Sequence, residues 1–156
     1  MYFRDKLVMF LATGGGAGNL PVAPGTFGSL LGLLLCFALS LLPPALSLPV
    51  LAAFIGLSIP IAHRAEKITG AKDPGRIVID ELAGMGVTMI TLPFNTATAV
   101  GAFVVFRVLD IAKPPPIRWI ERRLSGGVGV VMDDVVAGAI GHIILRFAMA
   151  QTVVSF

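Results

Sequence analysis

Charged residues are scarce in this chain. They make up 13% of its 156 residues, against 56% hydrophobic residues, whereas a soluble domain usually carries about 25% charged residues. So few charges exclude an intrinsically disordered chain, which is rich in charge and poor in apolar residues. With a net charge of only +3, they also exclude a nucleic-acid-binding protein, which needs a strongly basic surface. The length predicts a single domain that covers residues 1–156.

Cysteine is almost absent as well. The single Cys36 cannot form a disulfide within the chain, and neither it nor the two histidines has the spacing of a zinc site. None of the three glycine-rich segments matches the P-loop or the dinucleotide-binding fingerprint. These absences exclude a disulfide-stabilised scaffold, a zinc protein and the common nucleotide-binding motifs.

Two long segments, 7–62 and 82–106, contain no Asp, Glu, Lys or Arg. One helix needs about 20 apolar residues to cross a bilayer core, so the first segment has room for two spans and a loop. The sequence Leu42-Pro43-Pro44 is the natural break, and we expect a helical hairpin with the apolar runs 30–39 and 48–59 on either side. A soluble helical bundle is the weaker interpretation, because these runs offer almost no polar side chains to cover a surface.

The second uncharged segment, 82–106, is predicted to fold back on itself. Eleven of the twelve Lys and Arg residues lie in three segments around the uncharged ones, and the positive-inside rule places all three on the cytoplasmic side. One straight span would put two of them on opposite sides of the membrane. Residues 92–96 (LPFNT) are a turn signal, so we expect two short helices that enter and return on the cytoplasmic side.

The predicted fold class is therefore an all-α, polytopic membrane helical bundle. It contains the hairpin, a re-entrant or short-helix fold-back, and a last apolar segment from Val135 onward in which Arg146 lies deep. The acidic residues predict a site on its cytoplasmic face.

Six of the nine acidic residues form the candidate site: Asp73, Asp80, Glu81, Asp110, Asp133 and Asp134. A straight helix through 82–106 would hold Glu81 and Asp110 about 40 Å apart, whereas a fold-back brings the last three acidic groups together. Carboxylates gathered in this way repel one another and need a cation. Oxygen ligands favour Mg²⁺, with Mn²⁺ or Ca²⁺ as alternatives. The other interpretation is that the adjacent pairs only stabilise helix N-termini; three groups among nine acids favour a site.

Basic and hydroxyl side chains accompany these acids. Arg107 and Lys113 flank Asp110, and Arg118 follows three prolines. Cations beside a metal-binding cluster suit a phosphate, and we interpret Lys113 in this way, although a basic loop can also hold anionic headgroups. Thr26 and Ser29 precede the first long apolar run, where their hydroxyls could cap a helix or meet a phosphate.

Four sequence blocks resemble, in order, the phosphatidylglycerophosphatase A family. They are PGTFGS at 24–29, DPGRIVIDE at 73–81, FRVLDIAKP at 106–114 and GGVGVVMDD at 126–134. The resemblance implies a Mg²⁺-dependent enzyme of the bacterial inner membrane, with its active site facing the cytoplasm. It implies that the enzyme hydrolyses phosphatidylglycerophosphate to phosphatidylglycerol and inorganic phosphate, in phospholipid biosynthesis.

The resemblance also implies roles for individual residues. The metal ligands would be Asp80, Glu81, Asp110, Asp133 and Asp134. The catalytic candidates are Asp80, Glu81, Asp110, Lys113 and Asp134, and the substrate-binding candidates are Thr26, Ser29, Asp73, Arg107 and Arg118. In the expected reaction the metal ion activates a water molecule, and a carboxylate that does not bind the metal takes the proton of this water. A route through a phosphoaspartyl intermediate is the alternative that the sequence leaves open.

The main alternative is a membrane transporter for ions or small solutes. Intramembrane turns and acids at helix ends also build ion pathways. A transporter needs ionisable groups near the middle of the membrane, however, whereas nearly all of these lie at the edges of apolar segments. A non-catalytic lipid-binding subunit is disfavoured, because a dense carboxylate cluster would repel anionic headgroups.

Overall fold

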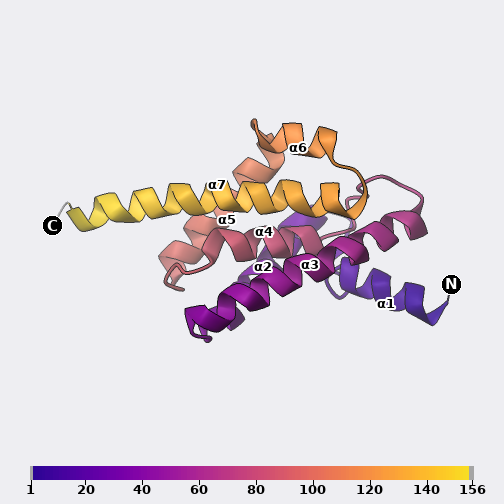
Figure 1. Cartoon of the computed structure of the whole chain (residues 1–156), viewed down its shortest axis with the longest axis horizontal. Coiled ribbons are helices and arrows are strands. Elements are labelled where there is room, and N and C mark those ends of the chain that lie inside the picture. Colours follow the sequence, from indigo (N-terminus) through magenta and orange to yellow (C-terminus); the bar gives the residue numbers. More distant parts are fainter. Residues whose placement is uncertain (1, 155–156) are drawn as a thin grey trace.

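The computed structural model describes residues 2–154, and its regular elements in this range are all helices (Figure 1). Along the chain they are α1 (Phe3–Ala12), the short 3₁₀ turn η1 (Ala17–Asn19), α2 (Pro24–Ser40), α3 (Pro44–Thr69), α4 (Ile79–Met89), α5 (Thr96–Ala112), α6 (Ile117–Arg123) and α7 (Gly126–Val154). The predicted all-α class is confirmed.

Two helices are long and apolar enough to cross a membrane. These are α3, over Pro44–Thr69, and α7, over Gly126–Gln151; α2 is apolar but only 17 residues long. Large apolar side chains on α3, among them Leu46, Leu48 and Leu57, are exposed on the surface of the protein. Extended apolar surface of this kind marks a contact with lipid or with another protein. The helices therefore suggest that the protein associates with a membrane.

The first uncharged segment divides where the sequence predicts. Helix α2 ends at Ser40 and α3 begins at Pro44. The expectation that Thr26 and Ser29 precede the first helix was wrong, because α2 already begins at Pro24 and includes both residues. Proline suits the first position of a helix, where its fixed φ is helical and its missing N–H is not needed.

The second uncharged segment also divides at the predicted turn. Helix α4 ends at Met89, and α5 begins after Asn95, whose side-chain Oδ1 accepts a hydrogen bond of 3.0 Å from the backbone N–H of Thr98. The two helices run antiparallel, because Arg107 near the end of α5 lies 4.0 Å from Glu81 in the first turn of α4. The segment thus folds back and returns its charged flanks to one end of the protein.

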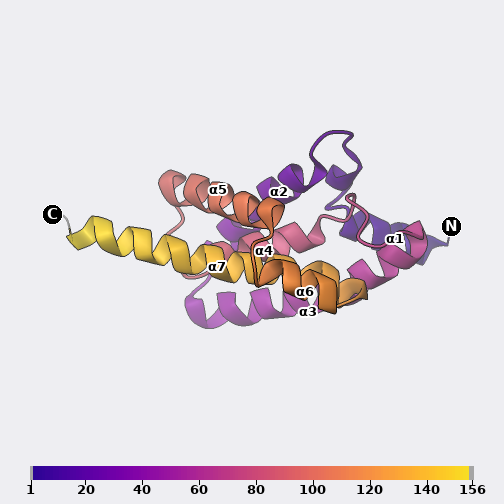
Figure 2. The ribbon, with the colours of Figure 1, turned by 90° about the horizontal axis from the view of Figure 1, so that it is seen from above.

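Helix α4 is the central helix, and α2, α3, α5 and α7 all pack against it (Figure 2). Glycines allow this close approach. A Cβ atom on Gly84 of α4 would lie 2.8 Å from the carbonyl oxygen of Asp134, and one on Gly138 of α7 would overlap the carbonyl oxygen of Gly84. On α2, a Cβ atom on Gly32 would lie 2.6 Å from Cβ of Met85. The backbones of three helices therefore meet around the first two turns of α4.

We expect Gly138→Ala to lower the melting temperature of the protein in a neutral detergent. The added methyl group would push α7 away from Gly84, and overpacking of this kind costs about 1–3 kcal/mol. Gly56→Ala is the matched control, since nothing lies within 4 Å of a Cβ atom at this position of α3. The control should keep or raise the melting temperature, because alanine is favoured over glycine in a helix by about 0.5–1 kcal/mol. Equal melting temperatures for the two variants would contradict the close α4–α7 contact.

Candidate active site

Three carboxylates meet where α4 and α7 cross. Asp80 and Glu81 lie in the first turn of α4, and Asp134 lies inside the first third of α7. Each offers one oxygen, and these oxygens all lie within 4.8 Å of one another. Asp80 and Asp134 are buried, with exposed fractions of 7% and 3%. Residues more than fifty positions apart are thus gathered into one cluster, which we call the carboxylate cluster.

The carboxylate cluster lacks the partners that buried charges need. Asp80 Oδ1, Glu81 Oε2 and Asp134 Oδ2 are all buried and have no hydrogen-bond partner within the described part of the chain. Burial raises the pKa of Asp80 well above its usual range, and the charges of Glu81 and Asp134 raise it further. Burial also raises the pKa of Glu81. Because unpaired buried carboxylates are costly and carboxylate oxygens are the ligands of hard divalent cations, the cluster fits a metal ion.

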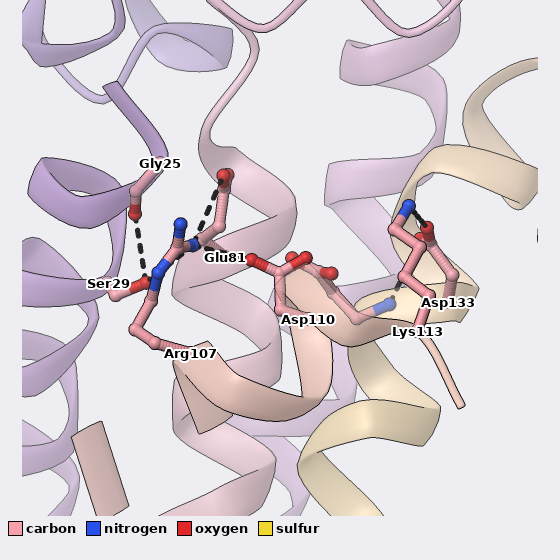
Figure 3. A network of polar contacts seen from close by, with 8 residues as sticks. Gly25, Ser29, Glu81, Arg107, Asp110, Lys113 and Asp133 are labelled. Carbon is pink, nitrogen blue, oxygen red and sulfur yellow. Dashed lines mark hydrogen bonds and ion pairs between the residues drawn. The ribbon is translucent and has the colours of Figure 1, made fainter. Parts of the chain in front are cut away.

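Arg107 on α5 is the cation that faces the carboxylate cluster (Figure 3). Its Nη1 atom forms an ion pair with Asp110, lies 4.0 Å from Glu81 Oε1, and donates a hydrogen bond of 3.4 Å to Ser29 Oγ. The Ser29 hydroxyl in turn donates to the carbonyl oxygen of Gly25 over 2.9 Å. The buried Nε of Arg107 has no partner among the described residues, so the guanidinium keeps a donor for an oxygen of a phosphate.

Gly25 is a site residue that the sequence reasoning missed. A Cβ atom at this position would overlap Glu81 Oε1 and lie 3.1 Å from Arg107 Nη1. The absence of a side chain therefore leaves room for both charged groups. A signal for it does exist in the sequence: Gly25, Gly28 and Gly32 follow the three- and four-residue spacing that places residues on one face of a helix.

Asp110 lies beside the carboxylate cluster. It is paired with Arg107, three residues earlier on the same helix. It is also near enough to Glu81 and Asp134 for their charges to interact. This position leaves it accessible to a metal ion, a water molecule or a substrate bound at the cluster.

Lys113 and Asp133 form a separate ion-pair group. Lys113 Nζ lies 2.7 Å from Asp133 Oδ2 and 2.9 Å from Glu121 Oε1 (Figure 3). Burial would lower the pKa of Lys113, but its hydrogen bonds to the two carboxylates outweigh burial and raise the pKa above its usual range. Asp133 turns away from Asp134 because adjacent helical residues point about 100° apart. Glu121, on α6, has no local sequence signal that would have identified it.

The other substrate-binding candidates are Thr26, Asp73 and Arg118, which lie on α2, on the loop before α4 and on α6. Thr26 is half-buried in the first turn of α2. Asp73 is exposed in the loop before α4, and it lines a cavity of about 330 Å³ together with Asp133 and Glu121. Arg118 donates a hydrogen bond of 3.1 Å to the carbonyl oxygen of Ala112. It therefore contacts the end of α5 rather than the carboxylate cluster.

Known proteins resemble this chain along most of its length. The phosphatidylglycerophosphatase A family model matches residues 10–149. Phosphatidylglycerophosphatase A of Escherichia coli K12 is 43% identical over 138 residues, which cover 88% of this chain and 80% of that protein. The protein of the same name from Haemophilus influenzae Rd is 37% identical over 144 residues, which cover 91% of this chain and 88% of that protein.

A third relative has a different name. A candidate phosphatidylinositol-3-phosphatase of Bacteroides thetaiotaomicron is 38% identical over 152 residues, which cover 91% of this chain and 93% of that protein. No solved structure matches the chain significantly. The family model spans the segments that contribute the carboxylate cluster, Arg107 and Lys113. The chain belongs to the phosphatidylglycerophosphatase A family.

Proposed function

We propose that this protein hydrolyses phosphatidylglycerophosphate to phosphatidylglycerol and inorganic phosphate, with Mg²⁺ as its cofactor, in phospholipid biosynthesis. One observation carries the proposal: three buried carboxylates with unpaired oxygens lie beside an arginine with an unpaired donor, in a chain of this family. The carboxylates need a cation, which a metal ion would supply. The unpaired arginine donor needs an anion, which the phosphate group of the substrate would supply.

Asp80, Glu81 and Asp134 would hold the Mg²⁺ ion, with Asp110 next to them. The ion, when bound, would offset charge on the phosphoryl group and favour deprotonation of the attacking water. Arg107 would donate to a phosphoryl oxygen and stabilise the charge of the transferring group. A carboxylate that does not bind the metal, such as Asp110, would take the proton of the water.

The remaining candidates would act around this centre. Ser29 orients Arg107 through its hydrogen bond, and Thr26 lies one turn before it on the same helix. Lys113 is a positioning residue in this proposal, because both of its carboxylate partners belong to neighbouring elements of the protein. Asp133 would fix Lys113 rather than bind the metal. Asp73, in the loop before α4, and Arg118, in the first turn of α6, would contact the headgroup.

We infer a bacterial inner-membrane location for the chain, which would form one domain over residues 1–156. Helices α3 and α7 would cross the bilayer, and α4 and α5 would enter and return from the cytoplasmic side. The starts of α2 and α4 and the end of α5 support this orientation, because they gather at the charged end of the bundle. The acyl chains of the substrate would stay in the bilayer while its phosphate reaches Arg107. A transporter is disfavoured because Asp80, Glu81 and Asp134 gather in one cluster and do not follow one another along a path through the bundle.

Removal of the metal should abolish phosphate release from phosphatidylglycerophosphate in mixed micelles. We expect chelator to inactivate the purified protein and added Mg²⁺ to restore it. Asp80→Asn and Asp134→Asn should each lower kcat by about 100-fold or more, the usual cost of losing electrostatic stabilisation in an active site. Asp5→Asn is the control, since Asp5 pairs with Arg64 at the protein surface. Full activity in chelator, or in both site variants, would refute the metal site.

The same assay with phosphatidylinositol 3-phosphate tests the second candidate substrate, which the Bacteroides relative suggests by its name. We expect a higher kcat/KM for phosphatidylglycerophosphate. The opposite order would change the proposed substrate and leave the metal site intact.

Arg107→Lys should lower kcat by about 10- to 100-fold and leave the melting temperature nearly unchanged. Lysine keeps the positive charge but lacks the planar fork that holds two groups at once. Arg123→Lys is the matched control, because Arg123 stacks on the Trp119 ring at 4.3 Å. An Arg107→Lys variant as active as this control would show that Arg107 does not contact the phosphate.

Cysteine labelling in intact cells tests the fold-back in the membrane. In a Cys36→Ser background, Asn95→Cys at the α4–α5 turn should resist a membrane-impermeant maleimide. Ready modification of Asn95→Cys from outside would mean that α4 and α5 cross the membrane instead.

A further inference from the structure

A large cavity lies at one end of the protein and shares no lining residue with the carboxylate cluster. Its volume is about 820 Å³, and it is enclosed by α1, the turn after α1, the end of α3 and the loop that leads to α4. Figures 1 and 2 both show α1 beside the end of α3. The proposed reaction uses none of these elements except the loop, so the cavity needs a different explanation.

Two positive charges in the cavity wall have no partner. Lys6 and Arg76 line it, and neither side chain forms an ion pair or hydrogen bond with any described residue. Asp5, next to Lys6, is already bound to Arg64 over 2.8 Å. Asp73, three residues before Arg76, lines a different cavity with Asp133 and Glu121. No acidic side chain is among the described residues that line the cavity. The cavity therefore has an uncompensated positive potential, which suits an anion.

The backbone holds the cavity open. Gly14, Gly15 and Gly16 have φ values of +56°, +70° and +104°, which a side chain would make unfavourable. The Val78 N–H donates to the carbonyl oxygen of Ala12 over 2.8 Å, and a Cβ atom on Gly18 would overlap the carbonyl oxygen of Arg76. These contacts fasten the loop before α4 to the turn after α1, so the backbone of Arg76 is held next to this turn.

One wall of the cavity is apolar and continues onto exposed apolar surface. Met9, Phe10 and Ile68 line it. Phe10 and Leu7 are exposed by 59% and 49%, and Phe3 of the same helix by 80%. Aromatic and aliphatic side chains next to Lys and Arg are typical of helices that contact the membrane interface. The anion that suits this cavity thus carries an apolar part.

We propose that this cavity binds the headgroup of an anionic phospholipid, with Lys6 and Arg76 on its phosphate and the apolar side chains of α1 against its acyl chains. The occupant is a lipid of the surrounding membrane and not the substrate. A free phosphate would use the two cations but leave Phe10 and its neighbours exposed to water. The inference does not depend on the proposed hydrolysis.

Native mass spectrometry of the whole protein in a neutral detergent tests this inference. The probes are phosphatidylserine and phosphatidylcholine with identical acyl chains, added separately, and inorganic phosphate as a competitor. We expect the protein to retain one phosphatidylserine and to bind phosphatidylcholine at least tenfold more weakly, since each Lys or Arg near an anionic lipid contributes about fivefold in affinity. Displacement of the lipid by an equal concentration of inorganic phosphate would overturn the assignment to a lipid.

The double variant K6Q/R76Q should lose about tenfold or more of its affinity for phosphatidylserine, and K6R/R76K should keep most of it. The variant R4Q/K67Q is the matched control, since it removes two exposed charges from α1 and the end of α3, which border the cavity, but none from the cavity lining. Equal losses in K6Q/R76Q and R4Q/K67Q would overturn the site, because they would indicate only surface charge.

Asp80→Asn in chelator should bind phosphatidylserine as the unaltered protein does. Loss of binding in this variant would place the lipid at the carboxylate cluster and also overturn the inference.

Discussion

Three carboxylates within 4.8 Å of one another, two of them almost fully buried, place the strongest physical constraint on this structure. Their mutual repulsion and lost hydration must be offset for the helices to stay in contact. The nearby positive charges do not offset this repulsion and lost hydration by themselves. Arg107 is shared with Asp110, and Lys113 is bound to Asp133 and Glu121. A metal ion would complete the balance, so the ion proposed to support the chemistry would also stabilise the α4–α7 contact.

Close contact between backbones makes the carboxylate cluster possible. Gly84 and Gly138 let α4 and α7 touch, and Gly28 and Gly32 let α2 approach α4. Small residues serve this purpose in membrane proteins, where helices gain little from the hydrophobic effect and depend on packing. Gly25 extends the same face of α2 to the site itself, where it leaves room for Glu81 and Arg107.

The basic residues divide into groups with different tasks. Arg107 faces the carboxylate cluster with an unpaired donor, whereas Lys113 ties α5 to α6 and α7. Lys6 and Arg76 lie apart from both, on a cavity without acids among its described lining. Within the modest net charge of +3, these basic residues thus have different proposed roles. Arg107 would bind the phosphate, Lys113 would support the structure, and Lys6 and Arg76 would bind a separate anion.

Sequence alone determined the helical class, both turns and the elements that contribute the site. Long apolar segments without charge are typical of membrane helices, and Pro43-Pro44 and Pro93-Phe94-Asn95 interrupt them for local reasons. It also indicated that the acids at 80–81, 110 and 133–134 belong together, since a fold-back of 82–106 brings Asp110 back to Glu81. The start of α2 was misplaced, because the apolar run begins only at Leu30, whereas the helix already begins at Pro24 with residues of mixed polarity.

Tertiary structure decided which side chain meets which. Asp133 and Asp134 are neighbours in sequence, yet one binds Lys113 and the other joins the carboxylate cluster. The sequence predicts a phosphate role for Lys113, and the structure adds that α6 brings Glu121 within 2.9 Å of its Nζ atom. Such partnerships depend on the rotation of each helix and on the distance between backbones. Both are set by contacts such as Gly84 with Gly138, between residues distant in the sequence, and local patterns do not contain that information.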